Sequence, residues 1–159
     1  MNNLHEQLEA LLAQRTCVIG LGNAGYGDDA IGVRLAETLS EAGREDVCIA
    51  GTSPERWLPR LAEDGFAHLL LVDTVDFGGN PGDVVLLDSA GIQNRYPQVS
   101  THKLSLGLLA RMVESQSRCR VWLLGIQPQS LQVDAGLSPA LQTTLESLLV
   151  LMQNHKILA

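Results

Sequence analysis

Two carboxylates and one imidazole are predicted to meet at one edge of this protein. Asp29 follows the first predicted strand, Asp73 ends the third, and His102 lies at the start of a later helix. In an open parallel sheet, ligands bind outside the carboxyl ends of the strands, so all three groups are expected on one edge. Two carboxylates and an imidazole can hold a divalent metal such as zinc or nickel. They can equally form an acid–base pair with an orienting histidine.

Each of these residues also has a purely structural interpretation. Asp28 is a good N-cap for the next helix, and Asp29 can serve in the same first turn. His102 can be an ordinary residue at a helix start, and Asp76, in a glycine-rich turn, is typical of an Asx-turn. Asp73 is harder to explain in this way, because a carboxylate that ends a buried strand is desolvated unless it has a partner.

Strands that alternate with helices position these groups. Apolar runs predict five strands, at residues 16–21, 46–51, 68–73, 83–88 and 120–126, the fourth of them as an antiparallel edge. Helical spacing predicts helices near residues 4–12, 28–43, 53–55 onward, 100–112 and 138–152. The pattern indicates an α/β fold, a three-layer sandwich with a mostly parallel twisted sheet of about five strands and helices on both faces. Residues 1–159 are expected to form one domain.

Some details of these elements are also predicted. Residues 91–100 are expected to be irregular, and the following helix is expected to begin at Ser100 or Thr101. Its inward side chains are predicted to be Leu104, Leu108, Leu109 and Met112. The remaining histidines are expected on the surface: His5, His68 and His155.

The loop after the first strand matches a dinucleotide-binding pattern but carries the wrong charge for it. Gly20 to Gly25 reads G-x-G-x-x-G between a strand and a helix. A pyrophosphate would need the helix N-terminus, where Asp28 and Asp29 would repel it. The second strand ends Ala50-Gly51-Thr52, without the carboxylate that would bind a ribose. No nucleotide is therefore expected.

Composition narrows the range of partners and compartments. The net charge of −7 argues against nucleic acid, which is bound through clustered lysine and arginine. Cys17, Cys48 and Cys119 are widely spaced within apolar runs and are expected to be buried thiols in a reducing compartment. The first residues lack the features of a signal peptide, and no apolar run is long enough for a membrane span. We expect a cytoplasmic protein without membrane contact, and nothing in the sequence requires more than a monomer.

Four segments, in order, resemble the hydrogenase maturation endopeptidases, which trim the C-terminal tail of the large subunit of nickel–iron hydrogenases. The matching segments cover most of the chain and are residues 20–23 with 27–33, residues 71–78 with Pro81-Gly82, residues 100–106 and residues 124–128. One departure is Gly25, which stands where the family usually has a larger apolar residue and which completes the glycine pattern.

The resemblance implies roles for these residues. Asp29, Asp73 and His102 match the family positions that face the nickel of the substrate. Asp29 and Asp73 are then the predicted catalytic residues. The resemblance further implies that nickel arrives with the large-subunit precursor, as part of the substrate. Contacts with that substrate are predicted for four further residues: Gly22, Asn23, Thr52 and Gln127.

Two mechanisms and two other functions stay open from the sequence. Substrate nickel can polarise the scissile carbonyl or activate water, or one aspartate can act as general base in aspartic-type hydrolysis. Residues 20–23, Gly-Leu-Gly-Asn, also resemble the peptidyl-tRNA hydrolases. The His-Asn pair and the basic surface that are expected of those enzymes are missing from this sequence. A non-catalytic module that binds nickel or a nucleotide is the remaining alternative.

Overall fold

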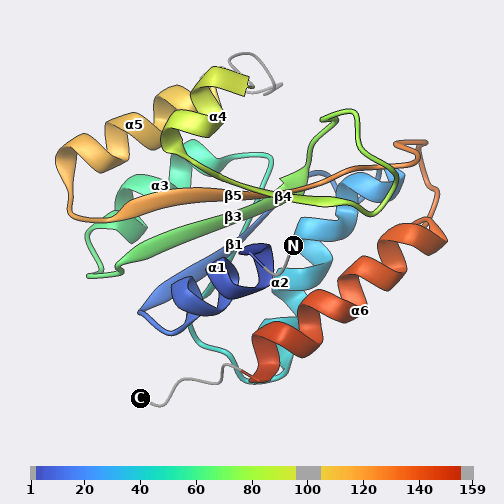
Figure 1. The fold of residues 1–159 in the computed structure, drawn as a ribbon, viewed down its shortest axis with the longest axis horizontal. Coiled ribbons are helices and arrows are strands. Elements are labelled where there is room, and N and C mark those ends of the chain that lie inside the picture. The colour runs from blue at the N-terminus through green and yellow to red at the C-terminus, as the bar shows by residue number, and fades with distance from the viewer. Residues whose placement is uncertain (1–2, 96–104, 155–159) are drawn as a thin grey trace.

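A five-stranded sheet runs through the protein, in a computed structural model that describes residues 3–95 and 105–154 (Figure 1). The strands are β1 (Thr16–Leu21), β2 (Val47–Gly51), β3 (His68–Thr74), β4 (Val84–Asp88) and β5 (Arg120–Ile126). Their order is β2-β1-β3-β5-β4, and only β4 runs antiparallel to its neighbour. The predicted α/β sandwich with a mostly parallel sheet and an antiparallel edge strand is confirmed.

Helices cover both faces of the sheet. They are α1 (Asn3–Leu12), the short 3-10 helix η1 (Gly27–Ala30), α2 (Ile31–Glu41), α3 (Pro54–Ala62), α4 (Ser89–Arg95), α5 (Leu106–Gln116) and α6 (Pro139–Asn154). Figure 1 shows α3, α4 and α5 on one side of the sheet and α1, α2 and α6 on the other. Within the described ranges, no helix combines the length and the apolar character that crossing a membrane requires.

The central strands are buried on both faces because successive side chains point to opposite sides. In β1, Ile19 belongs to the core beneath α3, α4 and α5, whereas Val18 belongs to the core beneath α1, α2 and α6. β3 continues both layers, with Leu71 beside Ile19 and Leu70 beside Val18 in the parallel register. The near-continuous apolar sequences of these strands reflect this double burial.

Two helices differ from the prediction. Residues 91–95, expected to be irregular, lie in α4, whose first turn is held by the Asp88 carboxylate accepting from the Gly91 N–H at 2.7 Å. α5 begins at Leu106, and its N-cap is Ser105, whose hydroxyl accepts from the Leu108 N–H at 3.1 Å. The expected start at Ser100 or Thr101, with Leu104, lies outside the described residues.

The predicted inward face of α5 is partly wrong. Leu109 is buried as expected, but Leu108 and Met112 are 45% and 43% exposed. The buried side chains of this helix include Leu106, Ala110 and Val113. The apolar face is therefore rotated away from the one that the sequence spacing suggested.

His68 is also not the surface histidine that was predicted. It is buried, and its ring hydrogen-bonds the Gln14 side chain at 2.9 Å and the Trp122 indole N–H at 3.0 Å. His68 thus joins the start of β3 to β5 and to the residues after α1. The three cysteines are buried free thiols, as expected.

Glycine allows α2 to lie directly against the sheet. A Cβ added at Gly32 would lie 2.2 Å from the carbonyl oxygen of Val72 and 2.5 Å from that of Leu21. Neither backbone oxygen can move without disturbing a central strand. The closeness of α2 to β1 and β3 determines where the loop that precedes this helix, residues 22–30, can lie.

We predict that Gly32→Ala destabilises the protein by about 3 kcal/mol, because the added methyl group overlaps backbone atoms of β1 and β3. The measurement is the free energy of unfolding in urea. Gly136→Ala is the matched control, since a Cβ there meets no atom within 4 Å. Equal unfolding midpoints for the two variants would contradict this account of the packing.

Candidate active site

The structure brings Asp29 and Asp73 together at the carboxyl edge of the sheet. Thr74 joins them, because its hydroxyl donates to Asp29 Oδ1 at 2.8 Å and its backbone N–H donates to Asp73 Oδ1 at 2.8 Å. Asp29 reaches this point from η1, and Asp73 from the end of β3. Both carboxylates are partly buried. We refer to Asp29 and Asp73 as the carboxylate pair.

The glycine loop supports the carboxylate pair from the other side. The Asn23 N–H donates to Asp29 Oδ2 at 2.8 Å, and the Asn23 side chain accepts from the Gly25 N–H at 2.9 Å. A Cβ at Gly22, where φ is +113°, would lie 2.1 Å from the Asp29 carbonyl oxygen and 3.3 Å from Asp73 Oδ1. Only glycine fits this position, so the loop can approach both aspartates closely.

Burial raises the pKa of Asp73 to about 8, and the nearby Asp29 carboxylate contributes to the increase, while the Thr74 N–H opposes it. Two like charges close together in a poorly solvated place favour a proton on one of them. At neutral pH Asp73 therefore holds a proton for most of the time. A carboxyl pair with one proton is the arrangement that acid–base hydrolysis by two aspartates requires.

Asp28 has a structural role that differs from the predicted N-cap. It is fully buried, and α2 has no side-chain cap. Its carboxylate accepts from the backbone N–H groups of Gln129, Ser130 and Ser138 at 2.8, 2.9 and 2.7 Å, and from the Ser138 hydroxyl at 2.9 Å. Burial favours the protonated acid, but these hydrogen bonds outweigh it and hold the pKa of Asp28 below its usual value. Asp28 thus joins the loop after β1 to the loop after β5.

Gln127 supports a turn through its side-chain amide. It is buried, and its Oε1 accepts from the N–H groups of Phe77 and Gly79 at 2.9 and 3.1 Å. Its Nε2 donates to Asp76 Oδ1 at 3.1 Å. The side-chain amide of Gln127 thus supports the turn after β3, and the substrate contact predicted for this residue stays a prediction. Asp76 forms the predicted Asx-turn by accepting from the Gly78 N–H at 3.2 Å.

Thr52 lies at the same edge of the sheet, directly after β2, and is exposed. The carbonyl oxygen of Gly51 accepts from the Gly22 N–H at 2.9 Å, which joins the end of β2 to the glycine loop.

His102 lies outside the described residues, and its place at this edge stays a prediction. Among residues 3–95 and 105–154, no three His, Cys, Asp or Glu side chains form a group that could hold a metal ion.

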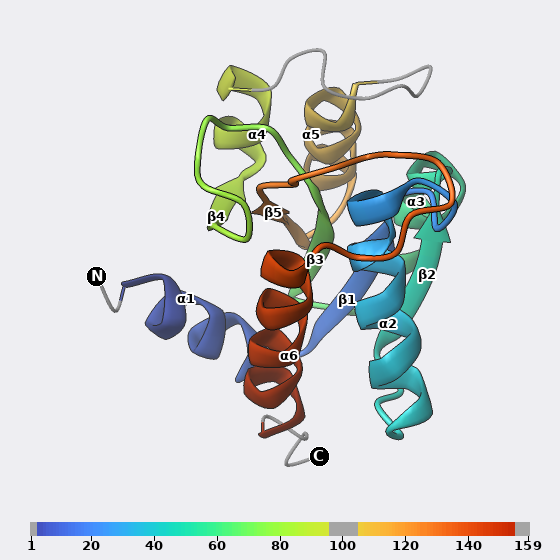
Figure 2. The same cartoon turned by 90° about the vertical axis from the view of Figure 1, so that its right-hand side faces the viewer.

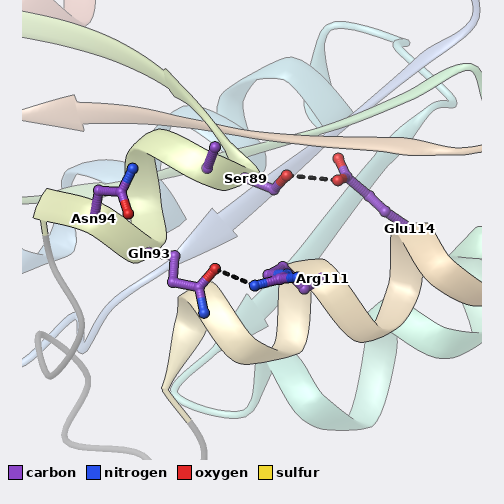
Figure 3. Close-up of a pocket in the computed structure, with 6 residues that line it drawn as sticks. Ser89, Gln93, Asn94, Arg111 and Glu114 are labelled. Atoms are coloured by element: carbon purple, nitrogen blue, oxygen red, sulfur yellow. Dashed lines mark hydrogen bonds between the residues drawn. The ribbon is translucent and has the colours of Figure 1, made fainter.

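A separate pocket of about 420 Å³ lies between α4 and α5 and contains none of the predicted site residues (Figure 3). The Ser89 hydroxyl donates to Glu114, and Arg111 donates to Gln93 at 2.8 Å. Glu114 also accepts from the Val121 N–H of β5 at 2.8 Å. These bonds hold α4 against α5, the two helices that flank residues 96–104 in the chain.

Comparison with known proteins identifies the family. A model of the hydrogenase maturation protease family matches residues 31–155. The hydrogenase 3 maturation protease of Escherichia coli (strain K12) is 34% identical over 110 residues, which span 68% of this chain and 69% of that protein. The chain belongs to the hydrogenase maturation protease family.

Solved structures of hydrogenase maturation proteases agree in fold. A [NiFe] hydrogenase maturation protease, HycI, from Thermococcus kodakarensis KOD1 has a TM-score of 0.82 and 30% identity over 94% of this chain and 97% of its own. The endopeptidase HycI from Escherichia coli has a TM-score of 0.74 and 27% identity over 87% and 89% of the two chains. The resemblance proposed from the sequence is confirmed, and it favours this family over the peptidyl-tRNA hydrolases.

We predict that Asp28→Asn destabilises this hydrogenase maturation protease by about 3 kcal/mol at pH 7, because an amide cannot accept all four hydrogen bonds. Since the folded-state pKa of Asp28 lies below the unfolded value, its stabilising effect is complete at neutral pH and is lost as the pH falls through the folded-state pKa. Urea unfolding at several pH values measures both effects. Asp64→Asn, at an exposed aspartate, should leave the unfolding midpoint unchanged; an equal loss there would contradict the special role of Asp28.

Asp73→Asn should have the opposite effect on stability. The pKa of Asp73 is about 8 in the folded protease and about 4 in an unfolded chain. Between these pH values Asp73 ionises mainly in the unfolded chain, so the free energy of unfolding falls as the pH rises. The variant lacks this ionisable group and should be more stable than the wild type at pH 8, with the difference declining towards pH 4. Parallel pH dependences of the two unfolding free energies would contradict the raised pKa.

Proposed function

We propose that this protease removes the C-terminal peptide of a nickel–iron hydrogenase large-subunit precursor after nickel has been inserted. The observation that carries the proposal is the carboxylate pair, joined by Thr74 at the carboxyl edge of the sheet. Family membership supports the substrate, since a matching relative is itself a [NiFe] hydrogenase maturation protease. The partner is then the precursor, and the reaction is hydrolysis of one peptide bond.

The protonation of the carboxylate pair supports aspartic-type chemistry. In this proposal Asp29 takes a proton from the attacking water, and protonated Asp73 donates a hydrogen bond to the carbonyl oxygen of the scissile bond. The Asn23 N–H and the Thr74 hydroxyl keep the Asp29 carboxylate in position. The low exposure of Asp73 preserves its proton at neutral pH.

Nickel belongs to the substrate in this proposal. Carboxylate oxygens and imidazole nitrogen suit nickel, so in the metal-assisted alternative Asp29, Asp73 and His102 contact the metal that the precursor carries. In the metal-assisted alternative, the substrate's own nickel polarises the scissile carbonyl. Because a carboxylate must lose its proton to bind a metal, the two mechanisms require different protonation states of Asp73.

We predict that Asp29→Asn and Asp73→Asn each lower the rate of precursor cleavage by about 100-fold or more, because general acid–base groups contribute roughly 10²–10⁴ to a rate. The assay follows loss of the C-terminal peptide from nickel-loaded and nickel-free precursor by mass spectrometry. Asp64→Asn, an exposed aspartate away from the pair, is the control with expected normal cleavage. Cleavage of the nickel-loaded form alone is the expected result, whereas normal processing by Asp73→Asn would contradict both mechanisms.

The pH profile separates the two mechanisms. If Asp73 must carry a proton, the wild-type rate should fall as the pH rises through about 8. If Asp73 acts only as a metal ligand, the rate should rise with pH over the same range and then level off. Single-turnover rates of cleavage at pH 6 to 9 measure this difference.

A further inference from the structure

Exposed hydrophobic side chains gather around the carboxyl edge of the sheet. Among the described residues, eight large hydrophobic side chains are exposed, and five of them follow strand ends or lie in the first turns of α3 and α5. These five are Tyr26, Trp57, Leu108, Leu131 and Val133. Exposed apolar side chains that cluster in this way mark interaction surfaces more often than scattered ones do.

Three of these residues lie on two neighbouring loops and form what we call the loop patch: Tyr26, Leu131 and Val133, which are 44%, 51% and 58% exposed. Tyr26 belongs to the loop after β1, and the other two to the loop after β5. The two loops run side by side (Figure 2), because the Asp28 N–H donates to the Ser130 carbonyl and the Asp134 N–H donates to the Gly25 carbonyl, both at 2.9 Å.

The loop patch is held rigidly. The buried Asp28 carboxylate accepts four hydrogen bonds from the loop after β5. A Cβ at Gly27 would lie 2.7 Å from the Ser130 carbonyl oxygen, so the two backbones are in close contact. Asp134 has a φ of 60°, in the left-handed region that aspartate adopts more readily than most residues, and its N–H donates to the Gly25 carbonyl. A backbone that is already ordered in this way lowers the entropic cost of binding.

The charged residues within the two loops themselves are all negative. Residues 22–30 and 127–138 contain Asp28, Asp29 and Asp134 and no lysine, arginine or histidine. Asp28 is buried and fully hydrogen-bonded, which leaves Asp29 and the exposed Asp134 to face a partner. The complementary surface is therefore apolar and bordered by basic groups.

We propose that the loop patch is the docking surface for the folded body of the hydrogenase precursor, which presents there an apolar area bordered by basic side chains. This inference rests on the proposed function. The Tyr26 carbonyl accepts from the Asp29 N–H at 3.0 Å, so a protein whose scissile bond reaches Asp29 comes close to Tyr26, one of the three residues of the loop patch. A specific protein–protein interface buries roughly 800 Å² on each partner, far more than two carboxylates can provide.

The test is the double variant Leu131→Ser/Val133→Ser, with Val150→Ser as the matched control on α6, where Val150 is 61% exposed. Steady-state cleavage of nickel-loaded precursor gives kcat and KM, and calorimetric titration with the same precursor gives its binding constant. For the double variant we expect a KM and a dissociation constant raised roughly tenfold or more, with kcat unchanged, because buried apolar anchors dominate interface energies. The control should match the wild type, and all three proteins should unfold at the same urea concentration.

Several outcomes would overturn the inference. An unchanged KM and binding constant would show that the precursor docks elsewhere, and a lower kcat with an unchanged KM would assign the loop to the chemical step. Sedimentation that shows a wild-type dimer, lost in the double variant, would make the loop patch a self-association surface. Failure of the proposed function would look different from failure of this inference. If the docking surface is right and the proposed function is wrong, the wild type binds the precursor, the double variant does not, and neither protein cleaves it.

Discussion

One buried carboxylate, that of Asp28, connects the two loops on which the proposed site depends. Taking a carboxylate out of water is unfavourable unless hydrogen bonds replace its hydration. Here the loop after β5 supplies four, three of them from backbone N–H groups. The loop therefore has a fixed path although residues 127–138 contain no helix or strand. The next residue, Asp29, is placed by the same connection.

The same edge of the sheet combines an ionised aspartate, Asp28, which stabilises the fold, with a mostly protonated aspartate, Asp73, which does not. Asp28 keeps its charge because its hydrogen bonds favour the carboxylate, whereas burial and the neighbouring Asp29 raise the pKa of Asp73. The folded protein thus keeps Asp73 protonated at neutral pH, and this lowers the free energy of unfolding. Functional sites commonly retain such groups at the expense of stability.

Much of this arrangement could be predicted from the sequence, because strand ends and apolar runs are local features. Asp29 and Asp73 follow recognisable strands, and parallel strands bring their carboxyl ends to one edge. The role of Asp28 could not be predicted in this way, because its hydrogen-bond partners lie 101 to 110 positions away in the sequence. In the sequence alone, an aspartate just before a helix looks the same as an N-cap. The same limit explains His68, whose burial depends on Gln14 and Trp122, both 54 residues away.

The glycine pattern at residues 20–25 shows why charge matters more than glycine spacing in assigning a ligand. In a dinucleotide site, glycine lets the backbone approach a pyrophosphate. Here the glycine at position 22 lets the backbone approach two aspartates, because a Cβ would overlap Asp29 and contact Asp73. An anion at this point would face the Asp29 carboxylate. A loop with the same spacing therefore favours a positively charged group of the substrate, which agrees with the proposed delivery of nickel by a precursor protein.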